Sequence, residues 1–147
     1  MKFSLDEEFL TSIFMYVKLM LLGYILEFLI MDGLIIKPNW LDLILKKEKT
    51  MEIRGSSTNK IGTKIYLIES RGKVKGTAII EKTIPLNGKL WEELKPYHKG
   101  TGSFESLLAR YSNPYAWVLT DVKELARPFD YEKHYGAVIW VKDVKRI

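Results

Sequence analysis

Four charged residues between positions 37 and 54 form the pattern in this sequence that is best suited to holding an anion: Lys37, Lys49, Glu52 and Arg54. If residues 50–54 form a strand, Glu52 and Arg54 project from one face, because side chains alternate along a strand. Lys49 lies at the preceding turn and Lys37 precedes a predicted helix, so both can lean over that face. Arg and Lys bind phosphate, and a carboxylate can accept a hydrogen bond from a base edge. The pattern predicts a basic cleft for a nucleotide or RNA.

The same strand has a simpler interpretation, in which its charges only decorate the surface. Met51 and Ile53 are its apolar positions and are expected to face inward. Glu52 and Arg54 then lie on the other face, where an exposed ion pair between them would contribute only about 0 to 1 kcal/mol. Ser56 has the same parity as these two charges, so it is expected beside them as a further ligand-binding residue.

The aromatic and histidine residues add one candidate contact and no metal site. Trp40 is the tryptophan best placed to touch a ligand, whereas Trp117 and Trp140 stand in apolar runs and are expected in the core. His98 and His134 lie in polar, loop-like stretches and are expected to be solvated. The chain has two histidines and no cysteine, a composition that disfavours the common metal sites. We therefore expect neither a metal nor another cofactor.

Length and composition predict one folded domain with a short appendage. The chain has 147 residues, of which 47% are hydrophobic and 28% charged, which is typical of a globular protein. Its formal net charge of +5 favours anionic partners. The absence of cysteine is compatible with a reducing cytoplasm, which is the expected location.

Local patterns predict several short strands with helices between them. Pro38 and Asn39 indicate a helix that ends near Leu45, with Asn39 as its N-cap. Apolar periodicity predicts two short helices within residues 87–111, separated by Gly100 and Gly102. The strands are expected at 50–54, 64–68, 74–80, 116–119 and 137–141. Strands and helices do not alternate regularly, so this is an α+β class with a strongly bent sheet or small barrel.

Residues 9–30 form a nearly continuous apolar run that needs a cover. Three interpretations are open: a helix packed on the domain or on a second subunit, a membrane anchor, or translated sequence upstream of a start at Met31. Lys18 and Glu27 favour protein over lipid as the cover, because charges inside a bilayer are costly. We predict an N-terminal helical extension over residues 1–30 and a separate domain over residues 31–147.

Residues 35–56 resemble the ASCH family, whose signature is a lysine-containing turn followed by a strand that reads Glu, any residue, Arg. Lys49, Glu52 and Arg54 match this signature. Later segments stand in the order of the family's remaining strands: YLIES, GTAII, PYAWVLTD and GAVIWVKD. The resemblance covers residues 31–147 and implies a PUA-like fold, a small mixed β-barrel with flanking helices. That superfamily includes RNA-binding and modified-base-binding domains.

The resemblance implies two functions, and the apolar extension adds a third. The first is binding of RNA or a modified nucleoside or nucleotide, with these ligand-binding residues: Lys37, Trp40, Lys49, Glu52, Arg54 and Ser56. The second is hydrolysis of RNA or of acetylated cytidine, which some members carry out with a lysine, a threonine three residues later and a distant glutamate. Lys49 matches that lysine, but Glu52 occupies the threonine position, so Glu52 would act as general base and Lys49 as acid or oxyanion partner. The third is a membrane-tethered or homodimeric interaction protein.

Overall fold

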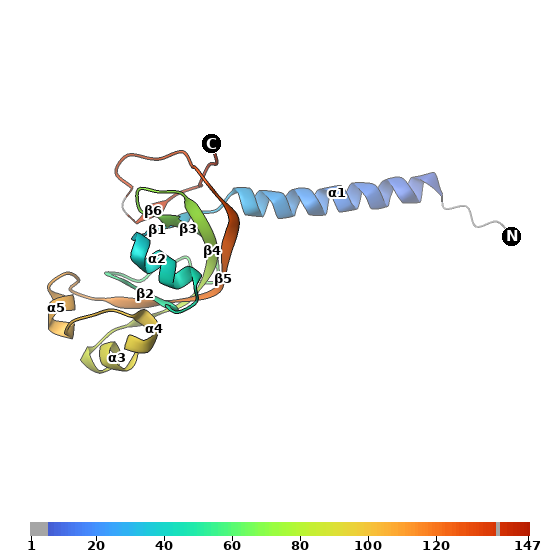
Figure 1. Cartoon of the computed structure of the whole chain (residues 1–147). Coiled ribbons are helices and arrows are strands. Elements are labelled where there is room, and N and C mark those ends of the chain that lie inside the picture. Colours follow the sequence, from blue (N-terminus) through green and yellow to red (C-terminus); the bar gives the residue numbers. More distant parts are fainter. Residues whose placement is uncertain (1–5, 138) are drawn as a thin grey trace.

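The computed structural model describes residues 6–137 and 139–147, except for the side chains of residues 26–29. A six-stranded mixed sheet forms the centre of the molecule, with the strand order β2-β5-β4-β3-β1-β6. The strands are β1 (Gly33–Ile36), β2 (Met51–Arg54), β3 (Lys64–Glu69), β4 (Val74–Pro85), β5 (Tyr115–Phe129) and β6 (Trp140–Val141). β1 pairs with β3 in parallel and the other neighbours are antiparallel. The sheet curls into a half-barrel (Figure 1).

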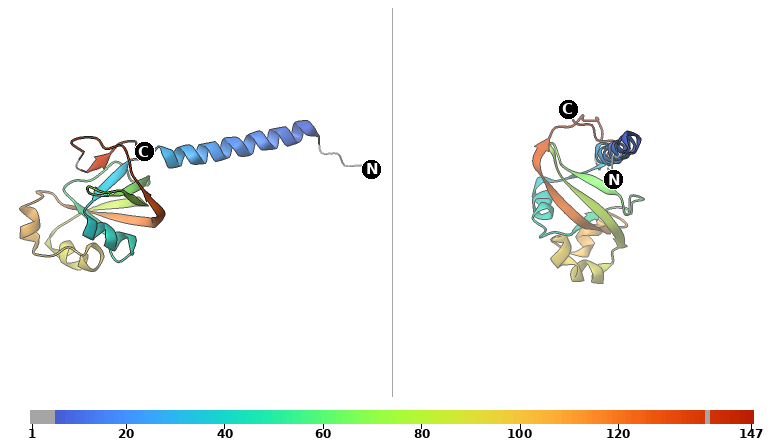
Figure 2. Two further views of the ribbon diagram at one scale, coloured as in Figure 1. Left: turned by 45° about the horizontal axis from the view of Figure 1, so that its top comes forward. Right: turned by 90° about the vertical axis from the view of Figure 1, so that its right-hand side faces the viewer.

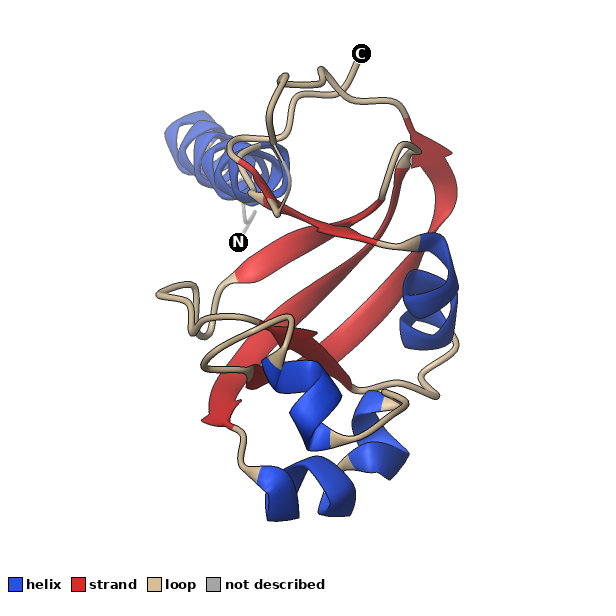
Figure 3. Ribbon diagram, turned by 90° about the vertical axis from the view of Figure 1, so that its left-hand side faces the viewer, coloured by secondary structure: helices blue, strands red, loops and turns tan. Residues whose placement is uncertain are grey.

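Five helices are attached to this sheet: α1 (Glu7–Leu29), α2 (Pro38–Leu45), α3 (Gly88–Glu93), α4 (Lys95–His98) and α5 (Phe104–Leu108). The last three gather at one end of the half-barrel, away from the end where α1 leaves it (Figure 3). α2 contacts both β3 and β5. The predicted α+β class, with a curved sheet and flanking helices, is therefore confirmed.

Irregular pairing between the two longest strands accounts for the curvature of the sheet. The register between β4 and β5 shifts at three places along their length, and Asp121 in β5 has a positive φ of 49°. Such bulges bend a strand and increase its twist. Gly76 lies at one of the shifts, where a Cβ atom would stand 2.6 Å from Leu45 and 2.8 Å from the Lys123 carbonyl oxygen. The close contact between α2 and the bent sheet therefore requires glycine at this position.

Two apolar clusters fill the domain. The larger lies between α2 and the sheet and contains Leu34, Ile36, Leu41, Ile44, Ile65, Leu67, Ala78, Ile80, Trp117 and Leu119. The smaller involves the C-terminal segment and contains Met31, Tyr66, Ile68, Val74, Tyr131, Val141 and Val144. Trp117 is buried, as expected, and stacks on the half-buried Trp140 with ring centroids 5.8 Å apart. Both clusters consist of residues from Met31 onward, and none of the described side chains of α1 belongs to either of them.

Several predicted elements differ from the structure: three helices stand where two were expected within residues 87–111, and the strands expected at 74–80 and 116–119 extend to Pro85 and Phe129. α2 begins at Pro38 with Lys37 as its N-cap and no side-chain cap, so the prediction of Asn39 as the cap was wrong. Proline favours the first helical position because its missing N–H would have no partner there. The strand predicted at 137–141 shortens to Trp140–Val141, because only two residues of β1 pair with it. Val138 lies outside the described residues.

α1 confirms the predicted N-terminal helix but corrects its expected packing. All described side chains of this helix, from Glu7 to Ile25, are exposed. Figures 1 and 2 show the helix projecting away from the half-barrel. A helix packed on its own domain was therefore a wrong expectation. Glu27, the second charge that favours protein as the cover, has its side chain outside the described part of the chain.

Candidate functional site

The charged face of β2 points into the molecule instead of to solvent. Glu52 is buried with 6% of its surface exposed, whereas Met51 and Ile53 are half-buried. Lys49, at the turn before the strand, is only 2% exposed. The expectation that the apolar pair faces inward was therefore wrong. A carboxylate and an ammonium withstand such burial only when each finds partners, and the cluster around Glu52 supplies them.

Glu52 holds the centre of this cluster between two cations. Its Oε2 accepts a hydrogen bond from the Arg54 guanidinium at 3.3 Å. Its Oε1 lies 3.6 Å from the Lys49 Nζ and accepts the backbone N–H of Ile53 at 3.1 Å. The side chain of Arg54 is 14% exposed. The pair of a buried Glu52 and a partly buried Arg54 is therefore not an exposed surface ion pair.

Lys49 is fixed by three different kinds of contact. Its Nζ donates a hydrogen bond to the carbonyl oxygen of His98 at 2.5 Å. The same ammonium lies 4.9 Å from the centre of the Trp40 ring, a cation–π distance. Burial lowers the pKa of Lys49 below its ordinary value, and the nearby Glu52 carboxylate offsets this effect only in part. The ammonium therefore loses its proton more readily than a lysine in water.

His98 is a buried organiser of the site, although the sequence indicated a solvated residue. Its side chain has no exposed surface. Its Nδ1 accepts the backbone N–H of Gly100 at 2.8 Å, so the ring proton sits on Nε2, which donates to the Trp91 carbonyl oxygen at 2.9 Å. The imidazole also stacks on Trp91, with centroids 4.2 Å apart. Burial lowers the pKa of His98, which favours the neutral ring. The hydrogen bonds of this ring fix the position of His98, whose own backbone carbonyl oxygen accepts from Lys49.

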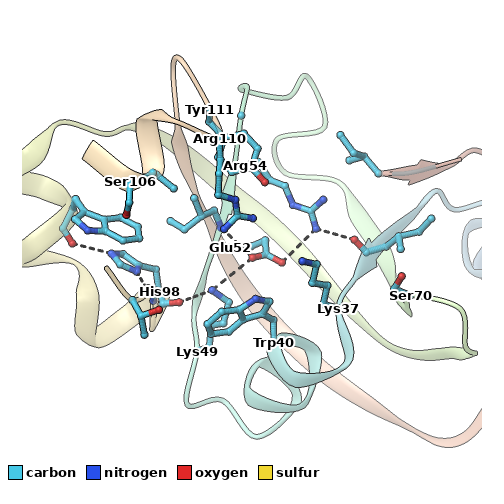
Figure 4. A pocket seen from close by; sticks show the side chains of 18 residues that line it. Lys37, Trp40, Lys49, Glu52, Arg54, Ser70, His98, Ser106, Arg110 and Tyr111 are labelled. Carbon is cyan, nitrogen blue, oxygen red and sulfur yellow. Dashed lines mark hydrogen bonds and ion pairs between the residues drawn. The ribbon is translucent and has the colours of Figure 1, made fainter. Parts of the chain in front are cut away.

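These residues form one wall of a cavity of about 480 Å³ (Figure 4). The cavity is lined by Ile35, Lys37, Trp40, Lys49, Glu52, Ile53, Arg54, Gly55, Ser70, Trp91, His98, Gly100, Thr101, Ser106, Leu107, Arg110, Tyr111 and Ile139. Its volume falls in the range of small-molecule sites. Four lining side chains are cationic (Lys37, Lys49, Arg54 and Arg110) and one, Glu52, is anionic. The cavity therefore favours an anionic ligand.

The cations form two layers. Lys49 and Arg54 are inside and share Glu52. Lys37 and Arg110 are exposed at the rim, and among the described residues neither forms an ion pair. The charges of Lys49 and Arg54 are thus largely paired within the protein, whereas Lys37 and Arg110 remain available to pair with a ligand.

Five of the six predicted ligand-binding residues meet at this cavity: Lys37, Trp40, Lys49, Glu52 and Arg54. Ser56 does not line it, because β2 ends at Arg54 and the Ser56 carbonyl oxygen instead accepts the Trp117 indole N–H at 2.8 Å. Sequence reasoning missed the opposite wall, which α5 and the turn after it supply with Ser106, Arg110 and Tyr111. In the described ranges, 6–137 and 139–147, no group of three or more His, Cys, Asp or Glu residues could hold a metal ion.

Comparison with known proteins gives a structural likeness. No protein-family model and no curated protein matches the sequence. A structure of ZmASCH from Zymomonas mobilis aligns with a TM-score of 0.53 and 19% identity, over 66% of this chain and 71% of that chain. Its tyrosine-to-phenylalanine variant aligns with a TM-score of 0.56 and 20% identity, over 67% of this chain and 74% of that chain. Its serine-to-alanine variant aligns with a TM-score of 0.62 and 16% identity, over 78% of this chain and 88% of that chain. The chain therefore has the α+β fold of the ASCH domain.

Proposed function

We propose that the cavity binds RNA or a nucleotide. The observation that supports this proposal is the excess of cations in an open, partly aromatic cavity: four basic side chains line it against one carboxylate. A mononucleotide combines a phosphate, which needs such cations, with a planar base, which stacks on aromatic rings. The volume of about 480 Å³ accommodates one nucleotide of a longer strand.

The phosphate is assigned to the rim. Lys37 and Arg110 are exposed, and the structure gives neither of them an ion-pair partner within its described ranges. An incoming phosphate would gain two charge-assisted contacts without displacing an existing ion pair. Arg54 is less available, because it already contacts Glu52 and the Ile35 carbonyl oxygen.

The base is assigned to the inner part of the cavity. Trp40 is half-buried and lines the cavity, and Tyr111 lines the opposite wall, so an aromatic residue stands on each side of the cavity. Glu52 accepts one hydrogen bond at each carboxylate oxygen and retains capacity for another donor. An amino group on a base edge would supply that donor.

Calorimetric titration tests this proposal with matched ligands. The full chain should bind a nucleoside 5′-monophosphate at least tenfold more tightly than the corresponding nucleoside, because the rim cations contact only the phosphate. Replacing Lys37 and Arg110 by Ala should abolish this difference. The controls are Lys82→Ala and Arg127→Ala, which remove exposed charges that do not line the cavity. Equal affinity for nucleoside and nucleotide would contradict the assignment.

One observation favours hydrolysis as a second candidate function. Lys49 is buried in the cavity, its pKa is lowered by burial, and it lies 3.6 Å from a carboxylate oxygen of Glu52. Such a pair can move a proton during attack of water. On this candidate, the chain would release acetate from acetylated cytidine or cleave single-stranded RNA, and Glu52→Gln would abolish turnover. Absence of turnover at high protein concentration, with nucleotide binding retained, would leave binding as the function.

A further inference from the structure

Between Phe9 and Ile25 the helix α1 exposes large apolar side chains on every side. Its large hydrophobic side chains between Phe9 and Ile25 have exposed fractions from 37% at Leu10 to 69% at Tyr24. Lys18 does not begin a polar face, since residues three or four positions away on a helix are its neighbours. At those positions stand Phe14, Met15, Leu21 and Leu22. A helix of this kind exposes apolar surface around its whole circumference.

The apolar side chains around the whole circumference of α1 indicate which surroundings can bury them: a protein partner, a membrane surface or the interior of a bilayer. A second copy of the chain, or a partner protein, would cover one stripe of the helix and leave the rest in water. A helix lying in the plane of a membrane surface needs a polar face, which α1 lacks. A lipid bilayer covers all sides of a helix at once, and it is the cover that matches the pattern.

The dimensions of α1 fit a bilayer. The candidate span Glu7–Ile25 has 19 residues, which at 1.5 Å per residue gives about 29 Å, compared with about 30 Å for the hydrocarbon core, and Glu27 follows this span in the sequence. The stretch Glu7–Ile25 has the length and composition of a membrane span, and none of it is buried by the protein. Lys18 is the one charge in the interior of that stretch, and the long lysine side chain can extend toward the headgroups. Glu7 and Glu8 occupy the first turn, at the end of the span.

We propose that α1 spans a lipid bilayer and tethers the cavity-bearing domain to its cytoplasmic face. Lys and Arg close to the end of a span favour the cytoplasmic side. Four lysines follow the helix within 20 residues: Lys37, Lys46, Lys47 and Lys49. The helices that surround the cavity, α3 to α5, lie at the far end of the domain from α1 (Figure 1). A tethered domain would therefore keep its cavity open to the cytoplasm.

The surface next to α1 supplies an independent argument. The C-terminal segment packs where the chain leaves the helix, and the backbone N–H of Val144 donates to the Met31 carbonyl oxygen at 2.9 Å. That segment exposes Lys142, Lys145 and Arg146. Basic side chains beside a span are attracted to the anionic lipids of the cytoplasmic leaflet. This surface thus complements the lipid headgroups that it would face.

Fractionation of the full chain expressed in a bacterial host tests the anchor. The protein should sediment with membranes and resist extraction by alkaline carbonate. Leu19→Arg combined with Leu22→Arg should move most of it to the soluble fraction, because two further charges would lie inside the span. Leu19→Met with Leu22→Met is the matched control and should behave as the parent. Extraction of the parent by carbonate, a soluble dimer, cleavage of the helix, or membrane retention of the arginine variant would each overturn the anchor.

A single introduced cysteine tests the orientation, because the chain has none of its own. Ser112→Cys places a thiol on the exposed surface of the domain. A membrane-impermeant maleimide should label it only after the inner membrane is broken. Labelling in cells with an intact inner membrane would overturn the cytoplasmic placement. Neither outcome depends on ligand binding, so the anchor and the proposed function can fail separately.

Discussion

Arg54 donates a hydrogen bond to the carbonyl oxygen of Ile35 at 2.8 Å and thereby connects β2 to β1. β2 is the first strand in the sheet order and β1 the fifth, so the contact crosses the open side of the half-barrel. The same guanidinium contacts Glu52 at 3.3 Å. One side chain therefore both bridges the open side of the half-barrel and contacts the carboxylate of the cavity.

Replacing Arg54 should reduce stability as well as binding. Arg54→Ala leaves the Ile35 carbonyl oxygen and Glu52 without this donor, which predicts a loss of about 1 to 3 kcal/mol in the free energy of unfolding. Arg54→Lys keeps the charge but not the planar guanidinium, so its free energy of unfolding should lie between those of the parent and Arg54→Ala. Urea denaturation measures the effect, with Arg127→Ala as the exposed control, expected within about 0.5 kcal/mol of the parent. Equal stability of Arg54→Ala and this control would show that the bridge has no structural role.

Lys49 should show the opposite balance. Its pKa is lowered chiefly by burial, so its ammonium is less stable in the folded protein than in water. Lys49→Met should therefore leave the free energy of unfolding unchanged or higher. Nucleotide affinity should fall about tenfold or more, because Lys49 is one of the four cations that line the cavity. Glu52 remains paired with Arg54 in this variant. A loss of more than about 3 kcal/mol on denaturation would instead identify Lys49 as a structural partner of Glu52.

His98 predicts a pH dependence of stability. Burial lowers its pKa most, Lys49 and Lys95 lower it further, and the Trp91 carbonyl and Glu92 oppose them. The unfolded chain then binds more protons below about pH 6.5, so stability is complete above that pH and decreases as the pH falls through it. Between pH 7.5 and pH 5.0, the free energy of unfolding should decrease less for His98→Gln than for the parent, as measured by denaturation at the two pH values.

The exposed His134 provides the control for this comparison. His134→Gln should lose as much stability as the parent between the two pH values. NMR titration of the imidazole protons should also place the midpoint of His98 below about 6.5. A His98→Gln variant with the pH dependence of the parent would contradict the buried neutral ring.

The strands predicted correctly are those whose signal is local. β3 and the start of β4 are apolar runs on either side of a turn at Arg71, where φ is positive, and such runs specify strands wherever they pack. The second halves of β4 and β5 are mostly polar and exposed. Each is a strand because it pairs with the first half of the other: Lys82 to Pro85 of β4 pair with Val118 to Tyr115 of β5, and Glu124 and Phe129 of β5 pair with Gly76 and Val74 of β4. Such pairing between distant segments leaves no pattern in either segment alone.

In the candidate site, too, the features that depend on local sequence were predictable, and those that depend on distant segments were not. Lys49, Glu52 and Arg54 share one strand and its turn, so alternation predicted their common face correctly. Burial of that face depends on α4, which packs against β2 from more than 40 residues away. His98 looked solvated because its partners, Trp91 and Gly100, meet it only after α3 and α4 fold together. A Cβ at Gly100 would overlap with the Trp91 ring, and that glycine was the available signal.

Deleting residues 1–30 should leave the domain folded. The described side chains of α1 belong to neither apolar cluster, and Met31 begins the smaller one. The free energy of unfolding should therefore stay within about 1 kcal/mol of the full chain. Circular dichroism and urea denaturation of the truncated protein measure this. A truncated chain that unfolds would show that the domain boundary at Met31 is misplaced.

The salt dependence of RNA binding tests the central claim most directly. For a single-stranded oligonucleotide, each phosphate contact contributes about 0.7 to the slope of log affinity against log salt concentration. Lys37→Ala combined with Arg110→Ala should therefore reduce that slope by about 1.4 and weaken binding at least tenfold. Lys82→Ala combined with Arg127→Ala removes the same charges outside the cavity and should leave the slope near that of the parent. Equal slopes for the parent and the rim variant would contradict the claim that this cavity holds the nucleic acid.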